Sequence, residues 1–134
     1  MKKILFDILG AAALLLVSVP LLAHHGAAAL DTGKEITLKG TVTEWVWSNP
    51  HCFLKFDVKG ESSNVAHWAV ETQAPSTMVQ WGWARTSFKA GDEVTVTLQP
   101  VKNGSPIGST RTVTFADGTV LVANGISPNP PAAK

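Results

Sequence analysis

The feature that most constrains this chain is the alternation of apolar and polar residues in three consecutive segments, residues 36–46, 51–58 and 66–71. A period of two places the apolar side chains on one face of an extended strand and the polar side chains on the other. The sequence Ser48-Asn49-Pro50 and the polar stretch around Gly60 are typical of turns, and they separate the three segments. We therefore expect a three-stranded antiparallel meander with one buried face.

The second half of the chain predicts a short helix followed by further strands. Pro75 can occupy the first turn of a helix and Gly82 is a natural stop, so a helix of one or two turns is expected between them. Gly40 interrupts the first strand, as at a bulge or a sharp bend. Three more strands are expected at residues 94–98, 111–115 and 119–123.

Three strands, a short helix and two or three more strands follow the order of an OB-type barrel. Closing a short sheet into a barrel buries the apolar side of each strand and removes free edges. We predict an all-β fold, a small five- to six-stranded OB-like barrel over residues 35–125, with the helix between strands three and four. An open sandwich of the same strands is the alternative. The Pro- and Ala-rich residues 126–134 predict a disordered tail.

The first 23 residues have the pattern of a secretory signal peptide. Two lysines follow the first Met, residues 8–22 are apolar, and Ala23 offers a small residue for cleavage. This apolar run is shorter than the ~20 residues that span a bilayer, which favours a cleaved signal over a retained anchor. Cleavage after Ala29 fits a small-x-small pattern, but Ala23 directly follows the apolar run. We expect a periplasmic protein whose mature form has no membrane span and begins with an arm, residues 24–34.

The charge balance argues against a nucleic-acid partner. The chain has 11 Lys and Arg against 10 Asp and Glu, a net charge of +1. Nucleic-acid binders usually carry a clear basic excess, because phosphate neutralisation supplies most of their affinity.

The sequence contains no arrangement that identifies an enzyme. There is no phosphate-binding loop, no nucleophile with a base and an acid in a known motif, and no Cys-x-x-Cys. Cys52 is the single cysteine, so no intrachain disulfide can form. The alternation places it on the core face, where it is expected to act as a small apolar residue.

Several short motifs occur together: His24-His25, Asn49-Pro50-His51, Trp68-Ala69-Val70-Glu71, Gly82-Trp83 and Lys89-Ala90-Gly91-Asp92. As a set they resemble a family of small exported bacterial proteins that is catalogued only as a domain of unknown function. The resemblance runs from about residue 24 to residue 123. It implies an OB-like fold and export from the cytoplasm, but the family brings no established activity.

The double histidine after Ala23 suggests a metal site. Cleavage there would make His24 the first residue, so that its amine and its imidazole could chelate one ion together. His25 adds a second imidazole, and His51 could complete a set of nitrogen donors that suits Cu(II) or Zn(II). The arm is long enough to reach the meander. The alternative is a solvated arm and a structural, hydrogen-bonded His51.

The polar face of the meander suggests a ligand surface. A first hairpin closed at the Ser-Asn-Pro turn places Trp47 opposite His51 and Trp45 opposite Phe53. The second hairpin places Phe53 near Glu71, which makes His51 and Glu71 the pair closest to a site. Exposed aromatic rings often mark a binding surface. A slip of one residue in this register would bury both tryptophans.

Two functions are therefore expected from the sequence. The first is an exported binding module for a small ligand or a metal ion, Cu or Zn, held by His24, His25 and His51 beside Trp45, Trp47, Phe53 and Glu71. The second is a protein-interaction module that docks on an envelope protein through the same aromatic face.

Overall fold

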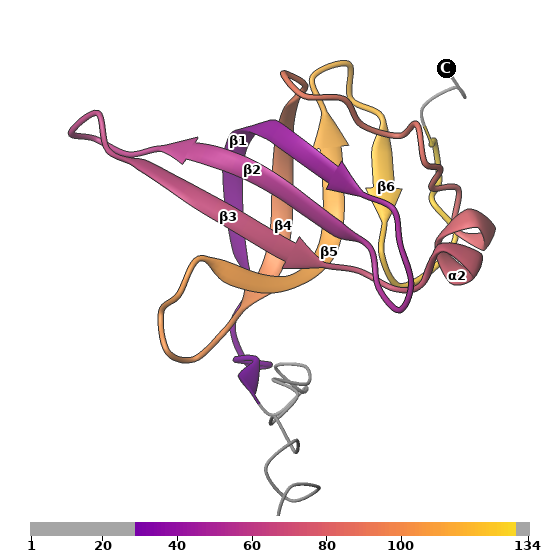
Figure 1. Ribbon diagram of the computed structural model, residues 1–134, viewed down its shortest axis with the longest axis horizontal. Helices are drawn as coiled ribbons and strands as arrows, with labels where there is room; N and C mark the ends of the chain where they lie inside the picture. The colour runs from indigo at the N-terminus through magenta and orange to yellow at the C-terminus, as the bar shows by residue number, and fades with distance from the viewer. Residues whose placement is uncertain (1–28, 131–134) are drawn as a thin grey trace, which may run out of the picture.

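The computed structural model describes residues 29–130, which form six strands and one short helix (Figure 1). The mostly extended backbone confirms the predicted all-β class, and the helix lies between the third and fourth strands as expected. No helix within these residues is long and apolar enough to cross a bilayer. The elements are β1 (Ile36–Val46), β2 (Phe53–Lys59), β3 (Val65–Glu71), α2 (Pro75–Gln80), β4 (Glu93–Pro100), β5 (Ile107–Phe115) and β6 (Val120–Val122).

The six strands form one sheet in the order β3-β2-β1-β4-β5-β6. Neighbours in this order are antiparallel, and β3 also pairs in parallel with β5, from Ala69↔Ile107 to Glu71↔Ser109. The parallel pairing closes five strands into a barrel, and β6 extends the sheet beyond β5. This closure confirms the predicted barrel, has the strand order of an OB fold, and rules out the open sandwich.

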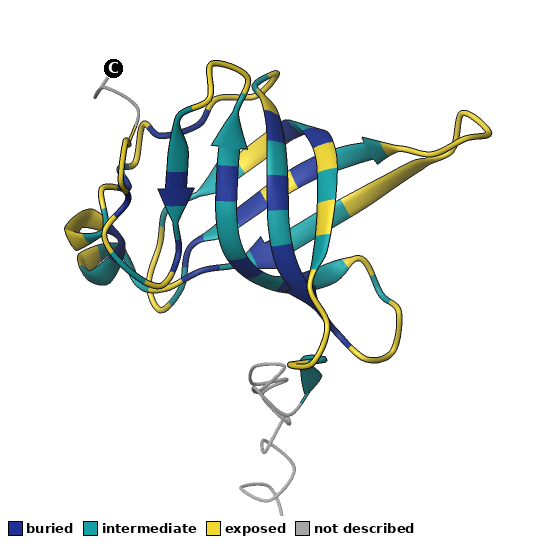
Figure 2. Ribbon diagram, turned by 180° about the vertical axis from the view of Figure 1, so that it is seen from behind, coloured by how far each residue is buried: buried dark blue, intermediate teal, exposed yellow. Residues whose placement is uncertain are grey.

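The barrel interior is filled by the alternating apolar side chains of its strands. Figure 2 shows buried positions recurring along the strands between less buried ones. Leu54, Phe56, Val70 and Val96 have no exposed surface. Burying each such side chain contributes about 1.5–3 kcal/mol to folding, so this alternation is the main source of stability in a domain without a disulfide. The described core also includes Val42, Cys52, Met78, Trp83, Phe88, Val94, Leu98, Val113, Leu121 and Ala123.

Two glycines allow the strands of the barrel to approach closely. A Cβ atom on Gly40 would lie 2.5 Å from the backbone oxygen of Asp57, and one on Gly108 would lie 2.4 Å from that of Gln99. Real Cβ atoms do not approach so closely, so only glycine fits where β1 and β5 meet their neighbours.

The irregularity in β1 lies beyond Gly40. Val42 pairs with Phe56 and Glu44 pairs with Lys55, so Thr43 is an extra residue without a partner on β2. Such a β-bulge shifts the alternation by one position for the rest of the strand. Residues of β1 after the bulge therefore face the opposite way from a regular strand.

Both ends of the described chain pack against the barrel. The backbone N–H of Lys102 donates to the carbonyl of Ala29 (3.0 Å), and that of Asp31 donates to Pro100 (2.8 Å). Part of the predicted arm is thus paired with the segment that follows β4. Leu30 also forms an isolated bridge with Val101.

The predicted disordered tail is wrong for its described residues, 126–130, whereas residues 131–134 lie outside the described part of the chain. Ser127 is buried, and its hydroxyl donates to the carbonyl of Trp81 (2.6 Å) while accepting from the N–H of Val122 (2.9 Å). Asn129 forms a bridge with Val120. Composition predicted disorder here, but one serine with both hydrogen-bonding roles satisfied ties this segment down.

Candidate functional site

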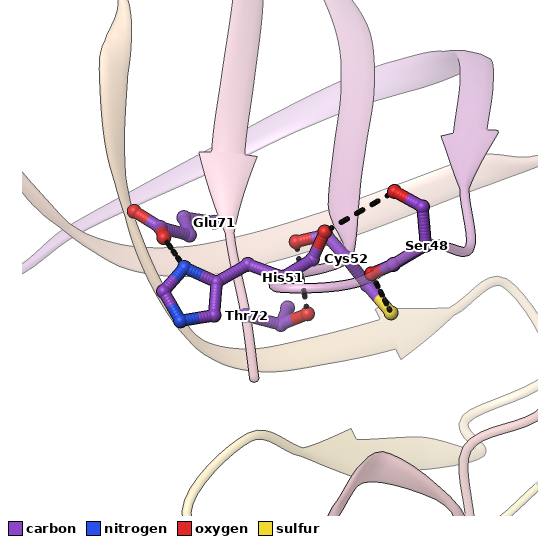
Figure 3. A network of polar contacts seen from close by, with 5 residues as sticks. All are labelled: Ser48, His51, Cys52, Glu71 and Thr72. Carbon is purple, nitrogen blue, oxygen red and sulfur yellow. Dashed lines mark hydrogen bonds and ion pairs between the residues drawn. The ribbon is translucent and has the colours of Figure 1, made fainter. Parts of the chain in front are cut away.

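The candidate site lies where the loop between β1 and β2 meets the end of β3 (Figure 3). Cys52 anchors this loop: its N–H donates to the carbonyl of Gln73 (3.0 Å) and its own carbonyl accepts from the N–H of Thr72 (2.9 Å). The Thr72 hydroxyl donates to the same carbonyl (3.1 Å). These bonds continue the β2–β3 pairing past the strand ends, so the backbone of His51 is held next to β3.

The central polar contact of this region joins His51 and Glu71. The Nδ1 atom of His51 faces a carboxylate oxygen of Glu71, and about a third of each side chain is exposed (32% and 28%). A neutral imidazole in this contact carries its proton on Nδ1, which puts the ring's lone pair on Nε2. Metal-binding histidines commonly have such a carboxylate behind the ring.

The outer face of the sheet supplies the neighbours of this pair. Register places Val46 opposite Phe53, Phe53 opposite Glu71, and Glu71 opposite Ser109. The predicted proximity of Phe53 and Glu71 is confirmed. Phe53 is half-buried, and its pairing places it on the outer face beside the Glu71 carboxylate.

The predicted outward positions of Trp45 and Trp47 are wrong. Trp45 lies opposite Leu54 rather than Phe53, because the bulge at Thr43 turns the following residues over. The Trp45 indole packs against the core and donates its Nε1–H to the carbonyl of Ala84 (3.0 Å). Trp47 packs against the core as well, with its ring centroid 5.6 Å from that of Trp45.

The two tryptophans belong to an aromatic cluster at one end of the barrel. The Trp45 ring centroid lies 5.7 Å from Trp83 and 5.1 Å from Phe88, and Phe88 stacks on Phe115 at 5.1 Å. Contacts at these separations are favourable beyond the area that they bury. The rings therefore pack together at this end of the barrel.

Comparison with known proteins gives the family. Residues 12–111 match the family of unknown function DUF6152. The chain belongs to this family. Searches of characterised proteins and of solved structures each returned no match.

The DUF6152 match spans both His51 and Glu71, together with five of the six strands described here in whole or in part. It also spans the double histidine. His24 and His25 themselves lie outside the described residues, so the structure places neither of them. The family description assigns no ligand and no activity to any of these positions.

Within residues 29–130, no three His, Cys, Asp or Glu side chains gather so that they could hold a metal ion. Cys52 is fully buried, as predicted, and burial raises the pKa of its thiol while its contact with the Ser48 carbonyl opposes that rise. A protonated interior thiol is a poor metal ligand. The described part of this DUF6152 protein can therefore supply His51, with Glu71 behind it, but not a complete metal site.

A second imidazole–carboxylate pair lies at the far end of the β2–β3 hairpin. Nδ1 of His67 lies 2.6 Å from a carboxylate oxygen of Asp57, and the His67 side chain is 79% exposed. Asp57 and His67 are cross-strand partners. This pair is separate from His51 and Glu71, since it lies four residues further back along β3.

The residues that fix the loop are not predicted by the sequence pattern. Thr72 and Gln73 follow the predicted third strand without an apolar pattern, so periodicity gave them no role. The available signal was the polar pair directly after Glu71, because backbone groups at a buried strand end need partners.

Proposed function

We propose that this protein is an exported, periplasmic binding module that holds a transition metal, Cu(II) or Zn(II), through His24, His25 and His51. The observation that carries the proposal is the His51–Glu71 contact at a partly exposed position. Glu71 then acts as the carboxylate that orients the imidazole, and not as a metal ligand. Such outer partners typically change metal affinity by 10–100-fold.

The path of the chain supports a site shared between the N-terminus and His51. Ala29 contacts Lys102, and Val101 in turn donates to Ile107, the partner of Ala69. Three strand spacings of about 4.8 Å therefore separate Ala29 from β3, and the site lies about 7 Å further along that strand.

The residues before Ala29 are sufficient for that distance. The two offsets combine to about 16 Å. Five peptide units place the backbone of His24 up to about 18 Å from Ala29. Four place that of His25 up to about 14 Å away, so the His25 side chain spans the remaining distance of about 2 Å. The two histidines can thus reach His51 while Ala29 keeps its contact with Lys102.

The choice of metal follows from the donor set. A terminal amine and imidazole nitrogens suit Cu(II) and Zn(II). Among divalent first-row ions, Cu(II) binds such donors most tightly. The single thiol of the chain lies in the core. We therefore expect tighter binding of Cu(II) than of Zn(II).

The test is calorimetric titration with Cu(II) and Zn(II) of the protein isolated from cells, after its N-terminal residue has been established by sequencing. We expect one equivalent to bind. His51→Ala should lose at least a tenfold factor in affinity, and Glu71→Gln should lose 10–100-fold.

The matched control is His67→Ala, which removes the other carboxylate-paired imidazole. It should leave the affinity unchanged. Absence of uptake by a protein that begins at His24, or equal losses in the His51 and His67 variants, would sink the proposal.

The alternative, docking on an envelope protein through an aromatic face, has less support. Of the predicted aromatic set, Trp45 and Trp47 pack against the core. Phe53 alone remains on the outer face beside Glu71. One half-buried ring is a small anchor for a protein partner.

A further inference from the structure

The β2–β3 hairpin has an unpaired edge that the metal site does not use. β3 pairs with β2 along its whole length, but with β5 only from Ala69 onward. No described strand covers the outer side of β3 between Val65 and Trp68. Figure 1 and Figure 2 show this hairpin projecting away from the barrel, and residues 60–67 are exposed.

The backbone groups on this edge can be assigned from the pairing pattern. The N–H of Ala69 donates to Pro106, so the backbone of Ala69 points toward the outer side of β3. Backbone direction alternates along a strand, so the N–H and C=O groups of His67 and Val65 point to the same side. Those of Ala66 and Trp68 point toward β2.

The sequence of this edge contains none of the features that usually prevent an exposed edge from pairing with another strand. Exposed edges usually carry a lysine, a proline, a bulge or an inward-pointing charge. Residues 62–70 contain no proline and no Asp, Glu, Lys or Arg, and the β2–β3 register is regular. Val65 is moreover 43% exposed, so an apolar side chain is accessible on this part of β3.

We propose that two copies of this protein pair through this edge, antiparallel, about a two-fold axis at Ala66. Val65 and His67 lie symmetrically about Ala66, so each Val65 meets His67 of the second copy. In such a pair, each residue donates its N–H to the carbonyl of the other, which gives two hydrogen bonds. The two-fold axis generates a second, identical pair, so four hydrogen bonds form in all. Opposed side chains lie on the same face, as antiparallel pairing requires.

Charge also favours a second copy as the occupant. No formal charges oppose one another along residues 62–70, and the low net charge of +1 gives little repulsion between copies. β5 limits the overlap, because Pro106 already pairs with Ala69. The turn that carries Glu61 therefore lies beside residues 101–106 of the second copy, where Lys102 supplies the opposite charge.

The first test is analytical ultracentrifugation of the protein over a wide concentration range. We expect a reversible dimer. Val65→Pro removes a donor that points to solvent in the monomer, and proline is tolerated at the start of an edge strand. It should raise the dissociation constant about tenfold or more, whereas Val65→Thr, which keeps the N–H and the β-branch, should change it little.

The second test does not depend on proline. Glu61→Lys and Lys102→Glu should each weaken the dimer, and the double reversal should restore it. A protein that is monomeric at every concentration, or a dimer that Val65→Pro and both charge reversals leave unchanged, would overturn the proposal. Neither result bears on metal binding, which is measured independently.

Discussion

Two imidazole–carboxylate pairs make the same kind of contact in different surroundings, and the surroundings determine what each pair can do. His51 is about one-third exposed and sits on a loop whose backbone is bonded to the end of β3. His67 is 79% exposed on a hairpin that extends from the barrel. At His51 this contact can orient the imidazole as a ligand. At His67 it is an exposed pair that contributes at most about 1 kcal/mol to stability.

The buried thiol of Cys52 gives a prediction at this scale. Burial raises the pKa of the Cys52 thiol above its ordinary value. The native state therefore keeps the proton at a pH where the unfolded chain loses it, so stability should fall as the pH rises past the pKa of the unfolded thiol.

The measurement is urea unfolding between pH 8 and pH 10, with Cys52→Ala as the control that lacks this dependence. A thiol reagent should react with the native protein far more slowly than with the unfolded chain. Rapid modification of the native thiol would contradict the buried position.

Among the elements, β1 shows most clearly where sequence reasoning succeeds and where it stops. Regular alternation located the strands, the core face of β2 and the β2–β3 register, because each depends on a period that the chain itself carries. The bulge at Thr43 depends on how β1 bends to pair with both β2 and β4. That requirement comes from barrel closure, which no local pattern records, so Trp45 and Trp47 were placed on the wrong side.

The other residues of the candidate site divide in the same way. Glu71 could be placed beside Phe53 because both lie in regular strands. The hold of Thr72 on the carbonyl of Cys52 could not be predicted, since it joins two loops that are distant in sequence. The metal hypothesis depends on His24 and His25, about which the described residues give no structural information.

The orientation of Trp45 can be tested by stability. Trp45→Ala should lower the free energy of unfolding by about 3 kcal/mol, because it removes a ring from the aromatic cluster and the hydrogen bond to Ala84. Thr43→Ala, at the exposed bulge, should change it by less than about 0.5 kcal/mol. Equal, small effects from both substitutions in urea titrations would indicate that the indole is on the outside.

For the whole molecule, the feature to note is that segments outside the five strands pack against the closed barrel. The chain before β1 pairs with residues 100–102, and the chain after β6 returns to Trp81. Trp83 adds a further link, since its Nε1–H donates to the carbonyl of Val122 (2.8 Å). The chain has a single cysteine and cannot form an intrachain disulfide, so these hydrogen bonds join its distant parts.

Truncation tests this arrangement. Ending the chain after Asn124 removes Ser127, which makes hydrogen bonds with Trp81 and Val122. At about 1 kcal/mol each, loss of these two hydrogen bonds should lower the free energy of unfolding by about 2 kcal/mol. Ending it after Pro130 should have no such effect, and thermal unfolding of the two truncated proteins should differ accordingly. Identical melting temperatures would show that the tail contributes nothing.

The hydrogen bond between Ala29 and Lys102 also depends on where a precursor of this protein would be cleaved. A peptidase that cut behind Ala29 would remove the carbonyl that receives the Lys102 N–H and would leave a charged ammonium on Leu30, against Val101. A cut behind Ala23 spares the bond. The folded domain would therefore keep this hydrogen bond after the proposed cleavage behind Ala23 but not after cleavage behind Ala29.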